Sequence, residues 1–283
     1  MYSLKIENTN GEIFELSHDY ENYYITDVQG LTPPATTVNT VKAGIIDGTF
    51  FNSASVEERN IVITLVINGD IEGNRQKLYR IFPRKTPCTI YFKNANRDVK
   101  IKGYVETIES NLFSQREKVQ ISIICPRPYF EDLAAIYAEL SAVLALFEFP
   151  FAIEEPIPFS EATDYPIAEI MNTGDAEAGC IITVDVKNTI QGIKIINTAT
   201  QQFFFLDSAF VDHDKIIIST ISGQMGVTLE RGGNKTNILN YVGANSTWLR
   251  LAPGVNYFTY TIDDGDSKDI EIGFTATLLH GGV

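Results

Sequence analysis

The second half of the chain is built from short segments in which apolar and polar residues alternate. Examples are GCIITVDVK (179–187), DKIIISTISG (214–223) and KDIEIGFTATLLH (268–280), and Gly, Asn, Asp and Ser separate such segments. Successive side chains of a strand point to opposite faces of a sheet, so this alternation predicts strands with one buried face. About eight or nine such segments recur roughly every 10 residues, which is typical of an antiparallel β-sandwich.

The first half is also predicted to be mainly strands. YSLKIEN (2–8) and EIFEL (12–16) alternate around Asn10-Gly11, where the glycine tolerates the positive φ of a tight hairpin turn. RNIVITLVIN (59–68) is the strongest strand signal of this half. The expected fold class is therefore mainly β, with a β-rich N-terminal domain followed by the sandwich.

One segment of the first half has helical spacing instead. Asp70 is a candidate N-cap, Leu78, Ile81 and Phe82 would share the buried face, and Pro83 would end the helix. Basic residues of a surface helix are expected on or beside its outer face. Those of this segment are Arg75, Lys77 and Arg80.

Two prolines divide the chain near its middle. The strand ISIIC (121–125) runs into Pro126 and Pro128, which cannot donate the hydrogen bonds of a ladder. From Glu131 onward, apolar residues recur with the spacing of a helix face. They are Leu133, Ile136, Tyr137, Leu140, Val143 and Leu144.

This break is the predicted domain boundary. We expect an N-terminal domain over residues 1–130, a partly helical linker over 131–150 and a C-terminal sandwich over 151–283. Two units of about 140 residues would each bury roughly 70% of their unfolded surface, which is enough for two independent cores.

Residues 28–50 interrupt the strand pattern of the first half. This stretch, VQGLTPPATTVNTVKAGIIDGTF, has two adjacent prolines, five threonines, three glycines and weak periodicity. It is too long for an ordinary connection within a domain. We expect it to leave the core of its own domain and to contact a surface elsewhere.

The charge balance argues against several binding functions. The 283 residues carry a formal net charge of −14, and residues 134–283 hold 7 Lys and Arg against 19 Asp and Glu. Binding to nucleic acid or to an anionic membrane needs clustered Lys and Arg. The charge balance therefore favours neither nucleic acid nor an anionic membrane as a partner. No apolar run reaches the ~18 residues that a membrane span needs.

The cysteines and the N-terminus suggest a protein made in a cytoplasm. Cys88, Cys125 and Cys180 lie next to apolar or small residues and form no C-x-x-C or Cys/His pattern. We expect them to be reduced, half-buried thiols. The N-terminal segment MYSLKIENTN has neither the basic nor the apolar region of a signal peptide.

The histidines show no catalytic pattern. His18, His213 and His280 are not paired by sequence with a nucleophile, and they lack metal-ligand spacing. His213 lies between Asp212 and Asp214, which favours a hairpin turn over the alternative of a weak cation site.

The carboxylate pairs do not indicate a hydrolase. Glu154-Glu155 and Asp263-Asp264 are neighbours in sequence, and adjacent strand residues point to opposite faces rather than across one cleft. The segment from Asp263 to Asp266 reads as a turn. No glycine turn follows a strand and opens a helix, so a phosphate cradle is not supported. We predict no catalytic residue, no cofactor and no metal ion.

Aromatic residues of the second half are candidates for stacking on a sugar ring. They include Trp248 and Tyr257, and the run Phe203-Phe204-Phe205 must turn at least one ring outward on a strand. The sequence leaves open whether these rings bind a ligand or pack in the core. The candidate glycan or partner contacts are Trp248, Tyr257 and Phe204.

Several strings occur together in a fixed order along the chain. They are LTPPATTVN, IDGTFFNS, RNIVITLVINGD, RQKLYRIFPRK, ICPRPYFED, LFEFPFAI, EIMNTGDAEAG and TWLRLAPGVNYFTYTI. With this order and spacing, nearly the whole chain resembles the distal tail proteins of long-tailed phages that infect Gram-positive bacteria.

The resemblance implies a structural function at the tip of the virion tail. Such proteins form a hexameric ring at the end of the tail tube, and their N-terminal domains form the wall of the channel. Their C-terminal domains are galectin-like sandwiches that face outward. The implied partners are further copies of the chain, the tail tube protein, a tail-associated spike or lysin protein, and receptor-binding or baseplate proteins. DNA would pass through the lumen without specific binding.

In this family a belt-like extension of each N-terminal domain holds the neighbouring copy. By order in the chain, the belt corresponds to about residues 29–58, which include the stretch expected to find another surface. The implied oligomer contacts are Leu31, Pro33, Pro34, Val41, Ile45, Ile46, Phe50 and Phe51. The alternative function is an adsorption module that binds host cell-wall glycans through the C-terminal sandwich.

Overall fold

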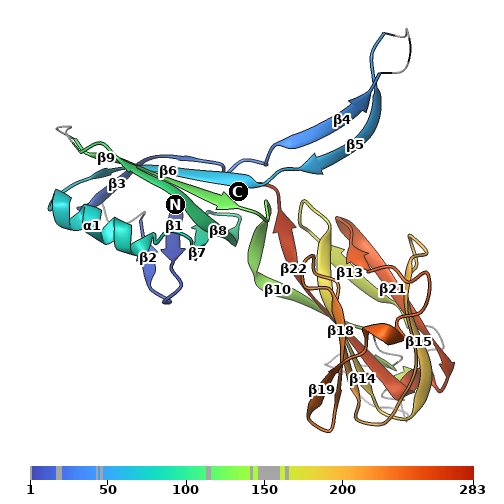
Figure 1. Cartoon of the computed structure of the whole chain (residues 1–283). Coiled ribbons are helices and arrows are strands. Elements are labelled where there is room, and N and C mark those ends of the chain that lie inside the picture. Colours follow the sequence, from blue (N-terminus) through green and yellow to red (C-terminus); the bar gives the residue numbers. More distant parts are fainter. Residues whose placement is uncertain are drawn as a thin grey trace, which may run out of the picture. The chain divides into compact units, whose positions relative to one another are not determined.

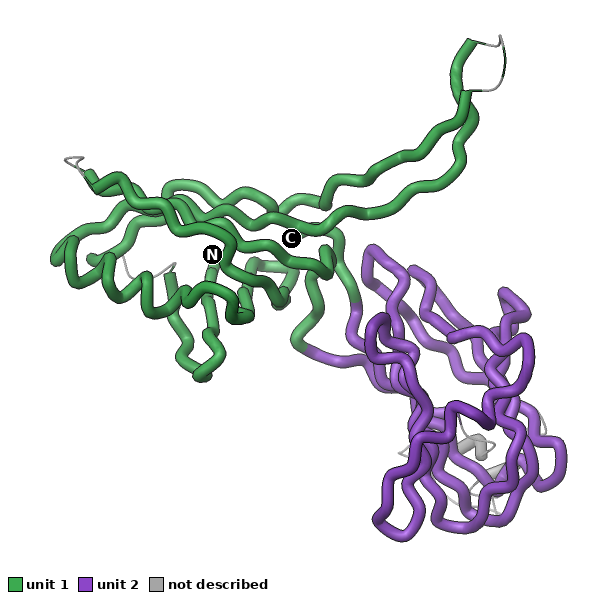
Figure 2. Tube along the Cα trace, in the orientation of Figure 1, with its two compact units in different colours: residues 1–133, 279–283 green, residues 134–278 purple. Residues whose placement is uncertain are grey.

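The computed structural model describes residues 2–16, 21–42, 44, 47–112, 116–140, 143–145, 160–162 and 166–283. The described chain is mainly β, with one α-helix, as the sequence predicts. It divides into two units, residues 1–133 with 279–283 (unit 1) and residues 134–278 (unit 2), which Figure 2 distinguishes by colour. No helix in the described part is long and apolar enough to cross a membrane.

Unit 1 contains an antiparallel sheet with the strand order β3-β6-β9-β8-β7-β1-β2 (Figure 1). The strands are β1 (Ser3–Glu7), β2 (Ile13–Glu15), β3 (Tyr23–Gln29), β6 (Arg59–Ile67), β7 (Pro87–Lys93), β8 (Asp98–Ser110) and β9 (Lys118–Cys125). Their alternate apolar residues form one core; in β6 these are Ile61, Ile63, Leu65 and Ile67. Burial of one face of each strand is the main favourable contribution to this unit.

The first hairpin forms where the sequence predicts it. β1 pairs with β2, and Gly11 has a φ of 77° in the turn between them. The side chain of Asn8 accepts hydrogen bonds from the backbone N–H groups of Asn10 (2.9 Å) and Glu12 (3.0 Å). The amide of Asn8 thus holds the turn closed, in the manner of an Asx turn.

The single α-helix, α1 (Ile71–Ile81), confirms the predicted cap and buried face. Asp70 accepts a hydrogen bond from the N–H of Gly73 (3.1 Å), and Leu78, Ile81 and Phe82 are buried in the core. Since the first N–H groups of a helix lack partners within it, this carboxylate stabilises the helix start.

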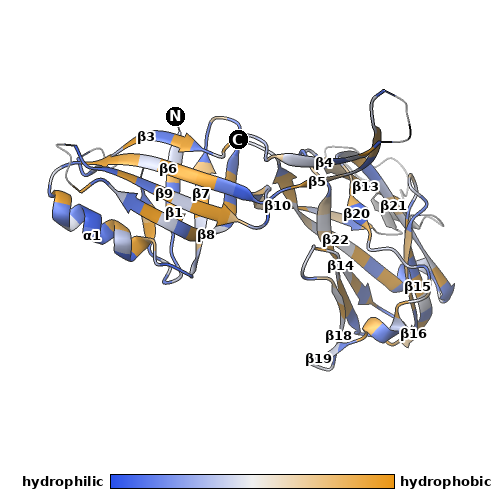
Figure 3. Cartoon of the chain, turned by 45° about the horizontal axis from the view of Figure 1, so that its top comes forward, coloured by the Kyte–Doolittle hydropathy of each residue, from blue (hydrophilic) through white to orange (hydrophobic). Residues whose placement is uncertain are grey.

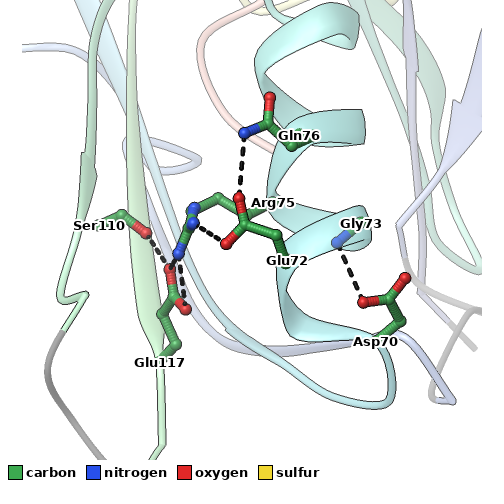
Figure 4. Close-up of polar contacts among 7 residues, drawn as sticks. All are labelled: Asp70, Glu72, Gly73, Arg75, Gln76, Ser110 and Glu117. Atoms are coloured by element: carbon green, nitrogen blue, oxygen red, sulfur yellow. Dashed lines mark hydrogen bonds and ion pairs between the residues drawn. The ribbon is translucent and has the colours of Figure 1, made fainter.

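Arg75 of α1 is more enclosed than an outer-face residue would be. Its guanidinium donates to both carboxylate oxygens of Glu117 (2.9 and 3.1 Å), and Glu117 also accepts a hydrogen bond from Ser110 (2.7 Å) (Figure 4). A further ion pair joins Arg75 to Glu72. The helix is therefore tied to the ends of β8 and β9, whereas Arg80 is exposed as expected.

The prediction of a helix from residue 131 is wrong over the described part of the linker. Residues Phe130–Leu140 form strand β10, which pairs with β8 through Glu131↔Lys100 and Asp132↔Val99 and lies next to β22. Phe130 and Leu140 are buried at its two ends. Pairing on both sides and burial of these ends override the helix propensity of the Ala-rich and Leu-rich sequence.

The rest of the predicted linker is not helical where it is described. Residues Val143–Ala145 form β11, which pairs with β12 (Ser160–Ala162). Residues 141–142 and 146–150 lie outside the described residues.

Besides the β11–β12 pair, unit 2 has two larger antiparallel sheets, and Figure 3 shows apolar and polar residues alternating along their strands. One sheet has the order β13-β21-β15-β16, with β13 (Ala168–Asn172), β21 (Gly254–Asp264), β15 (Ile190–Asn197) and β16 (Phe203–Phe210). The other has the order β19-β18-β17-β14-β22-β10, with β19 (Asn234–Asn237), β18 (Gly226–Arg231), β17 (Lys215–Ser219), β14 (Ala178–Val186) and β22 (Ile270–His280).

The two sheets of unit 2 pack through their apolar faces. Phe258 of β21 and Phe274 of β22 are both buried, and their ring centroids lie 4.9 Å apart. The three segments quoted for their alternation, residues 179–187, 214–223 and 268–280, contain β14, β17 and β22. A two-residue strand, β20 (Arg250–Leu251), also pairs with β14. The sandwich predicted from alternation is present.

The ends of the units differ from the predicted domain limits. The chain passes from unit 1 to unit 2 after residue 133, within β10, rather than through a separate linker. It returns at residue 279, near the end of β22, so residues 279–283 belong to unit 1. No feature of the sequence predicted this return.

Gly30, at the end of β3, has a conformation and surroundings that exclude a side chain. Its φ is 82°, and a Cβ there would overlap the carbonyl oxygen of Asn60. Gly11 has a similar φ of 77°, but a Cβ there would meet no atom within 4 Å.

These two glycines provide a matched test. Gly11→Ala should lower the free energy of unfolding by about 1 kcal/mol, the cost of a left-handed conformation. Gly30→Ala should cost about 3 kcal/mol or more, because the overlap with Asn60 must also be relieved by moving β3 or β6. Denaturant titration of both variants measures the difference. Equal losses would show that the contact with Asn60 is not restrictive.

Candidate functional site

A two-stranded hairpin extends from the sheet of unit 1 and forms the candidate functional site. β4 (Thr36–Val41) pairs with β5 (Phe50–Val56), with a bulge between Asn39 and Thr40. Figure 2 shows this hairpin as a projecting arm, and every residue of both strands is exposed. We call it the arm. It occupies the place that the sequence predicts for the belt.

The arm carries apolar side chains that no part of its own core covers. Phe50 and Phe51 are 59% and 69% exposed, and Val38, Val41 and Val56 are also exposed. Contiguous exposed apolar surface of this kind marks a site of interaction with another surface. Val41, Phe50 and Phe51 of the predicted contacts lie on the arm, whereas Ile45 and Ile46 lie outside the described residues.

The three remaining predicted contacts lie at the root of the arm. Leu31 is half-buried against the core of unit 1, and its carbonyl accepts a hydrogen bond from the N–H of Val283 (3.1 Å). Pro33 is exposed and packs against Gly282, where an added Cβ would lie 3.0 Å from the proline Cδ. Pro34 is half-buried. Leu31 and Pro33 thus contact the C-terminal segment of their own chain.

One buried arginine, Arg59, binds the root of the arm to the rest of unit 1. Arg59 is 2% exposed and lies at the start of β6, three residues beyond the end of β5. Its guanidinium donates to the backbone carbonyls of Pro128 (2.6 Å), Thr32 (2.7 Å), Gly30 and Gly281. Gly30 and Thr32 lie at the start of the segment that leads into the arm. Pro128 precedes β10, and Gly281 follows β22.

The surroundings of Arg59 explain why a cation is tolerated there. Burial lowers the pKa of its guanidinium, but an arginine starts from so high a value that it stays charged. The guanidinium carbon lies 4.5 Å above the centroid of the Phe130 ring, a cation–π contact. Four carbonyl acceptors and one aromatic face together replace the water that the charge loses.

Two more contacts hold the C-terminal segment in unit 1. His280 Nε2 lies 3.0 Å from a carboxylate oxygen of Asp132, and Arg97 donates a hydrogen bond to the carbonyl of Gly282. His280 is buried. His280 therefore has a structural role, in contact with a residue of β10.

The cysteines have no features of reactive thiols. Cys88, Cys125 and Cys180 are free and buried. Burial raises the pKa of Cys88 and Cys180 to about 11 and that of Cys125 to about 12. A nucleophilic cysteine needs a lowered pKa, so these thiols are unsuited to covalent catalysis.

His213 and its aspartate neighbours form a turn between strands. His213 has a φ of 66° and an exposed side chain. Asp214 is buried and accepts hydrogen bonds from Arg231 (2.7 and 2.5 Å) and from the N–H of Val211 (2.8 Å). Burial would raise the pKa of Asp214, but these hydrogen bonds outweigh it and the pKa is lowered. Asp214 thus fixes the turn.

Among the other carboxylate candidates, Asp266 has structural contacts. Asp266 caps the short helix η2 (Ser267–Asp269), and Asp269 bonds back to the N–H of Asp266 (2.9 Å). His18, Glu154 and Glu155 lie outside the described residues. In the described ranges, no group of three or more His, Cys, Asp or Glu residues is placed to hold a metal ion.

The aromatic candidates of the sandwich differ in exposure. Phe204 is 1% exposed and packs against Trp248, with ring centroids 5.1 Å apart, so Phe204 presents no ring face to a ligand. The expectation of a contact through Phe204 therefore conflicts with its position. Trp248 is half-buried by this packing, and Tyr257 is exposed on β21.

Sequence reasoning missed Arg59 as part of the site. Its hydrogen-bond acceptors are backbone carbonyls, which every residue has, and one of them is 222 positions away. The only local signal is an arginine at the first position of a strongly apolar strand. A charge at that position has no partner in the strand and needs acceptors from elsewhere.

Family models match both units of the chain. The model of a phage tail protein RIFT-related domain matches residues 7–125. The model of the C-terminal domain of the siphovirus-type tail component matches residues 173–277. No curated protein matches the chain in sequence.

A solved structure shares the fold. The crystal structure of the Dit protein (gp 19.1) of phage SPP1 is described as a paradigm of the hub adsorption apparatus in phages that infect Gram-positive bacteria. It is 14% identical, has a TM-score of 0.68, and covers 98% of this chain and 99% of its own. A chain of the phage P2 baseplate in its activated conformation with calcium is 11% identical. Its TM-score is 0.49, and it covers 97% of this chain and 98% of its own.

The two family models together account for most of the chain, and they follow each other in the order of its two units. An exposed apolar arm, which is suited to contact with another surface, is also consistent with a structural component of a phage tail. The chain belongs to the family of siphovirus-type distal tail proteins.

Proposed function

We propose that this protein is a structural hub of the phage tail tip. Six copies form a ring that joins the tail tube to the baseplate or adhesion device, and DNA passes through the ring. The observation that carries this proposal is the arm, an exposed hairpin with Phe50 and Phe51 uncovered by its own core. Such side chains need another chain to remove them from water.

The arrangement of the arm suits assembly from identical copies. Each chain carries one arm, and its root is bound by Arg59 to the core of unit 1. A fixed root defines the direction of the arm. A contact between two different surfaces of the chain repeats from copy to copy, and it closes into a ring when the rotation from one copy to the next divides a full turn. Six copies is the number implied by the resemblance to distal tail proteins.

The proposed role is structural and not catalytic. The thiols have raised pKa values, and Asp214 and Asp266 serve as structural contacts. These observations support a function through contact surfaces. The partners in this role are other copies of the chain, the tail tube protein, a tail-associated protein, and receptor-binding or baseplate proteins.

The charge balance of the N-terminal half gives DNA no net attraction. Residues 1–133 hold 15 Lys and Arg against 17 Asp and Glu, a balance of −2. A channel wall without a net positive charge would release few counterions from DNA and would bind it weakly.

Removing the arm should abolish assembly and leave the fold intact. The backbone N–H of Glu57 donates to the carbonyl of Ala35 (3.0 Å), so a two-residue Asn-Gly turn can replace residues 36–56. We expect the complete chain to form a hexamer in multi-angle light scattering and the deletion variant to be monomeric. Circular dichroism and thermal unfolding check the fold.

Substitutions on the arm give the matched comparison. Phe50→Ser with Phe51→Ser should reproduce the loss of the hexamer, because both rings are exposed and apolar. Ser53→Ala with Ser55→Ala, on the same strand and also exposed, should leave the hexamer unchanged. Hexamers formed by the deletion variant would exclude the arm as the assembly contact, and monomers of the complete chain at all concentrations would contradict self-assembly.

Arg59 should be required for both the stability of unit 1 and assembly. Arg59→Met removes the donor of four hydrogen bonds, and a hydrogen bond to a charged group contributes about 1.5–3 kcal/mol to stability. We expect denaturant titration to show a loss of about 3 kcal/mol or more, and light scattering to show fewer hexamers. Arg80→Met, which changes an exposed arginine of the same unit, is the control and should alter neither measurement.

A second candidate function is the binding of host cell-wall glycans by the sandwich. The observation that favours it is the partly exposed pair of Trp248 and Tyr257 on unit 2, since exposed rings can stack on sugars. This function would be additional to assembly, because it uses a different unit.

Tyr257 permits a clean test of glycan binding. Tyr257→Ala should weaken binding to bacterial cell-wall polysaccharides on a glycan array about tenfold if its ring stacks on a sugar. Tyr241→Ala is the control, because Tyr241 is exposed to the same extent, 39% against 40%. Trp248→Ala is read together with its unfolding temperature, since Trp248 also packs on Phe204. A complete chain that binds no polysaccharide would remove this candidate.

A further inference from the structure

Unit 2 has a polar pocket on the outer face of the sheet that contains β14. The pocket has a volume of about 270 Å³ and is lined by residues of β10, β14, β17 and β22. Thr183 and Asp185 of β14 line it, and they alternate with Ile182 and Val184, which are buried in the sandwich. The pocket therefore lies on the face of the sheet that points away from the core. Its volume is close to the lower limit for small-molecule sites, about 300 Å³, and suits one small ring.

The side chain of Tyr137 forms an aromatic platform at this pocket. Tyr137 is 65% exposed, and its ring lies against the backbone of β22. A Cβ added at Gly273 would lie 3.2 Å from Tyr137 Oη and 3.4 and 3.6 Å from two carbons of the ring. The glycine thus leaves the space that the ring occupies. An aromatic ring that is supported by the sheet and still largely exposed can stack on the flat face of a ligand.

Three carboxylates surround the phenol end of this ring. Tyr137 Oη donates a hydrogen bond to Glu139 (2.8 Å). This hydrogen bond raises the pKa of Tyr137, and the charges of Asp185 and Glu271 raise it further. The hydroxyl therefore stays protonated at neutral pH, and its hydrogen bond restricts the orientation of the ring.

The carboxylates of the pocket can accept further hydrogen bonds. Asp185 lies 3.3 Å from the ammonium of Lys215, and Glu271 pairs with Lys187. A carboxylate can accept about four hydrogen bonds, so one ion pair leaves acceptor positions for a ligand. Both ion pairs are about half-exposed, and such pairs contribute little to stability. Stability therefore does not explain why these charges gather around one exposed ring.

The chemistry of the pocket fits a neutral sugar. A pyranose ring has an apolar face of C–H groups, which can stack on Tyr137, and hydroxyls around its edge, which can donate to carboxylates. Lys215 is outnumbered by the three carboxylates of the lining, and this excess opposes an anionic ligand. A wholly apolar ligand would remove the charges from water without pairing them.

We propose that this pocket binds one pyranose ring of a neutral saccharide, stacked on Tyr137 and hydrogen-bonded to the carboxylates around that ring. The inference rests on the second candidate function, glycan binding by the sandwich, and assigns it to a different sheet from that of Tyr257. The hub function does not depend on it.

Saturation-transfer difference NMR on the complete chain tests the proposal. The probes are the methyl glycosides of glucose, galactose and N-acetylglucosamine, and titration gives the dissociation constant of each. We expect at least one of them to bind, and Tyr137→Ala to weaken its binding about tenfold or more. Tyr137→Phe keeps the stacking ring and should weaken binding less than Tyr137→Ala does.

Two further variants separate the position of the ring from the composition of the pocket. Gly273→Ala adds a Cβ 3.2 Å from Tyr137 Oη, so it should displace the ring and weaken binding although every polar group of the pocket remains. Tyr241→Ala is the control, because Tyr241 is 39% exposed and does not line the pocket. It should leave the dissociation constant unchanged. Thermal unfolding of each variant checks that the sandwich is intact.

The outcomes separate this inference from the function on which it rests. Binding that is lost in Tyr257→Ala but retained in Tyr137→Ala would overturn this site and leave glycan binding by the sandwich intact. Acetylarginine amide is the cationic probe, and binding of this compound in place of all three sugars would overturn the assignment to a sugar. A complete chain that binds none of the three glycosides, and no cell-wall polysaccharide on the array, would contradict both.

Discussion

The carbonyl contacts of Arg59 are the constraint on which the rest of unit 1 depends. One guanidinium joins the segment that leads into the arm, the residues before β10 and the C-terminal segment after β22. A buried cation is tolerated only if its donors are satisfied, so the backbone at all four acceptors must keep its position. Gly30 meets this requirement because its positive φ and missing Cβ allow its chain to approach Asn60.

A rigid root explains how the protein can expose an arm without losing order. A two-stranded hairpin is marginally stable in water by itself. Here contacts within unit 1 restrict the direction of the arm. The carbonyl of Leu31 accepts a hydrogen bond from the N–H of Val283, and Arg59 donates to the carbonyls of Gly30 and Thr32. Less conformational freedom is then lost when the arm meets another surface, which favours binding through preorganisation.

The sequence predicts what depends on local pattern and misses what depends on distant partners. Alternation identified strand segments of the sandwich, and Asp70 identified the start of α1. Residues 131–140 were mispredicted because their helix propensity is a local property, whereas pairing with β8 and β22 is not. The exposed Phe50 and Phe51 were found within the predicted belt. The role of Arg59 and the return of the chain to unit 1 at residue 279 were not predicted, because the hydrogen-bond acceptors involved are backbone groups far along the chain.

Exposure of Phe50 and Phe51 has a physical meaning only in an assembly. Leaving a large apolar side chain in water rather than burying it costs about 1.5–3 kcal/mol. A monomer with these two rings exposed would also risk indiscriminate association through the free edges of β4 and β5. A partner surface that covers the arm would remove both liabilities at once. In the proposed ring every arm would be covered in this way, and a closed ring limits growth to a fixed number of copies.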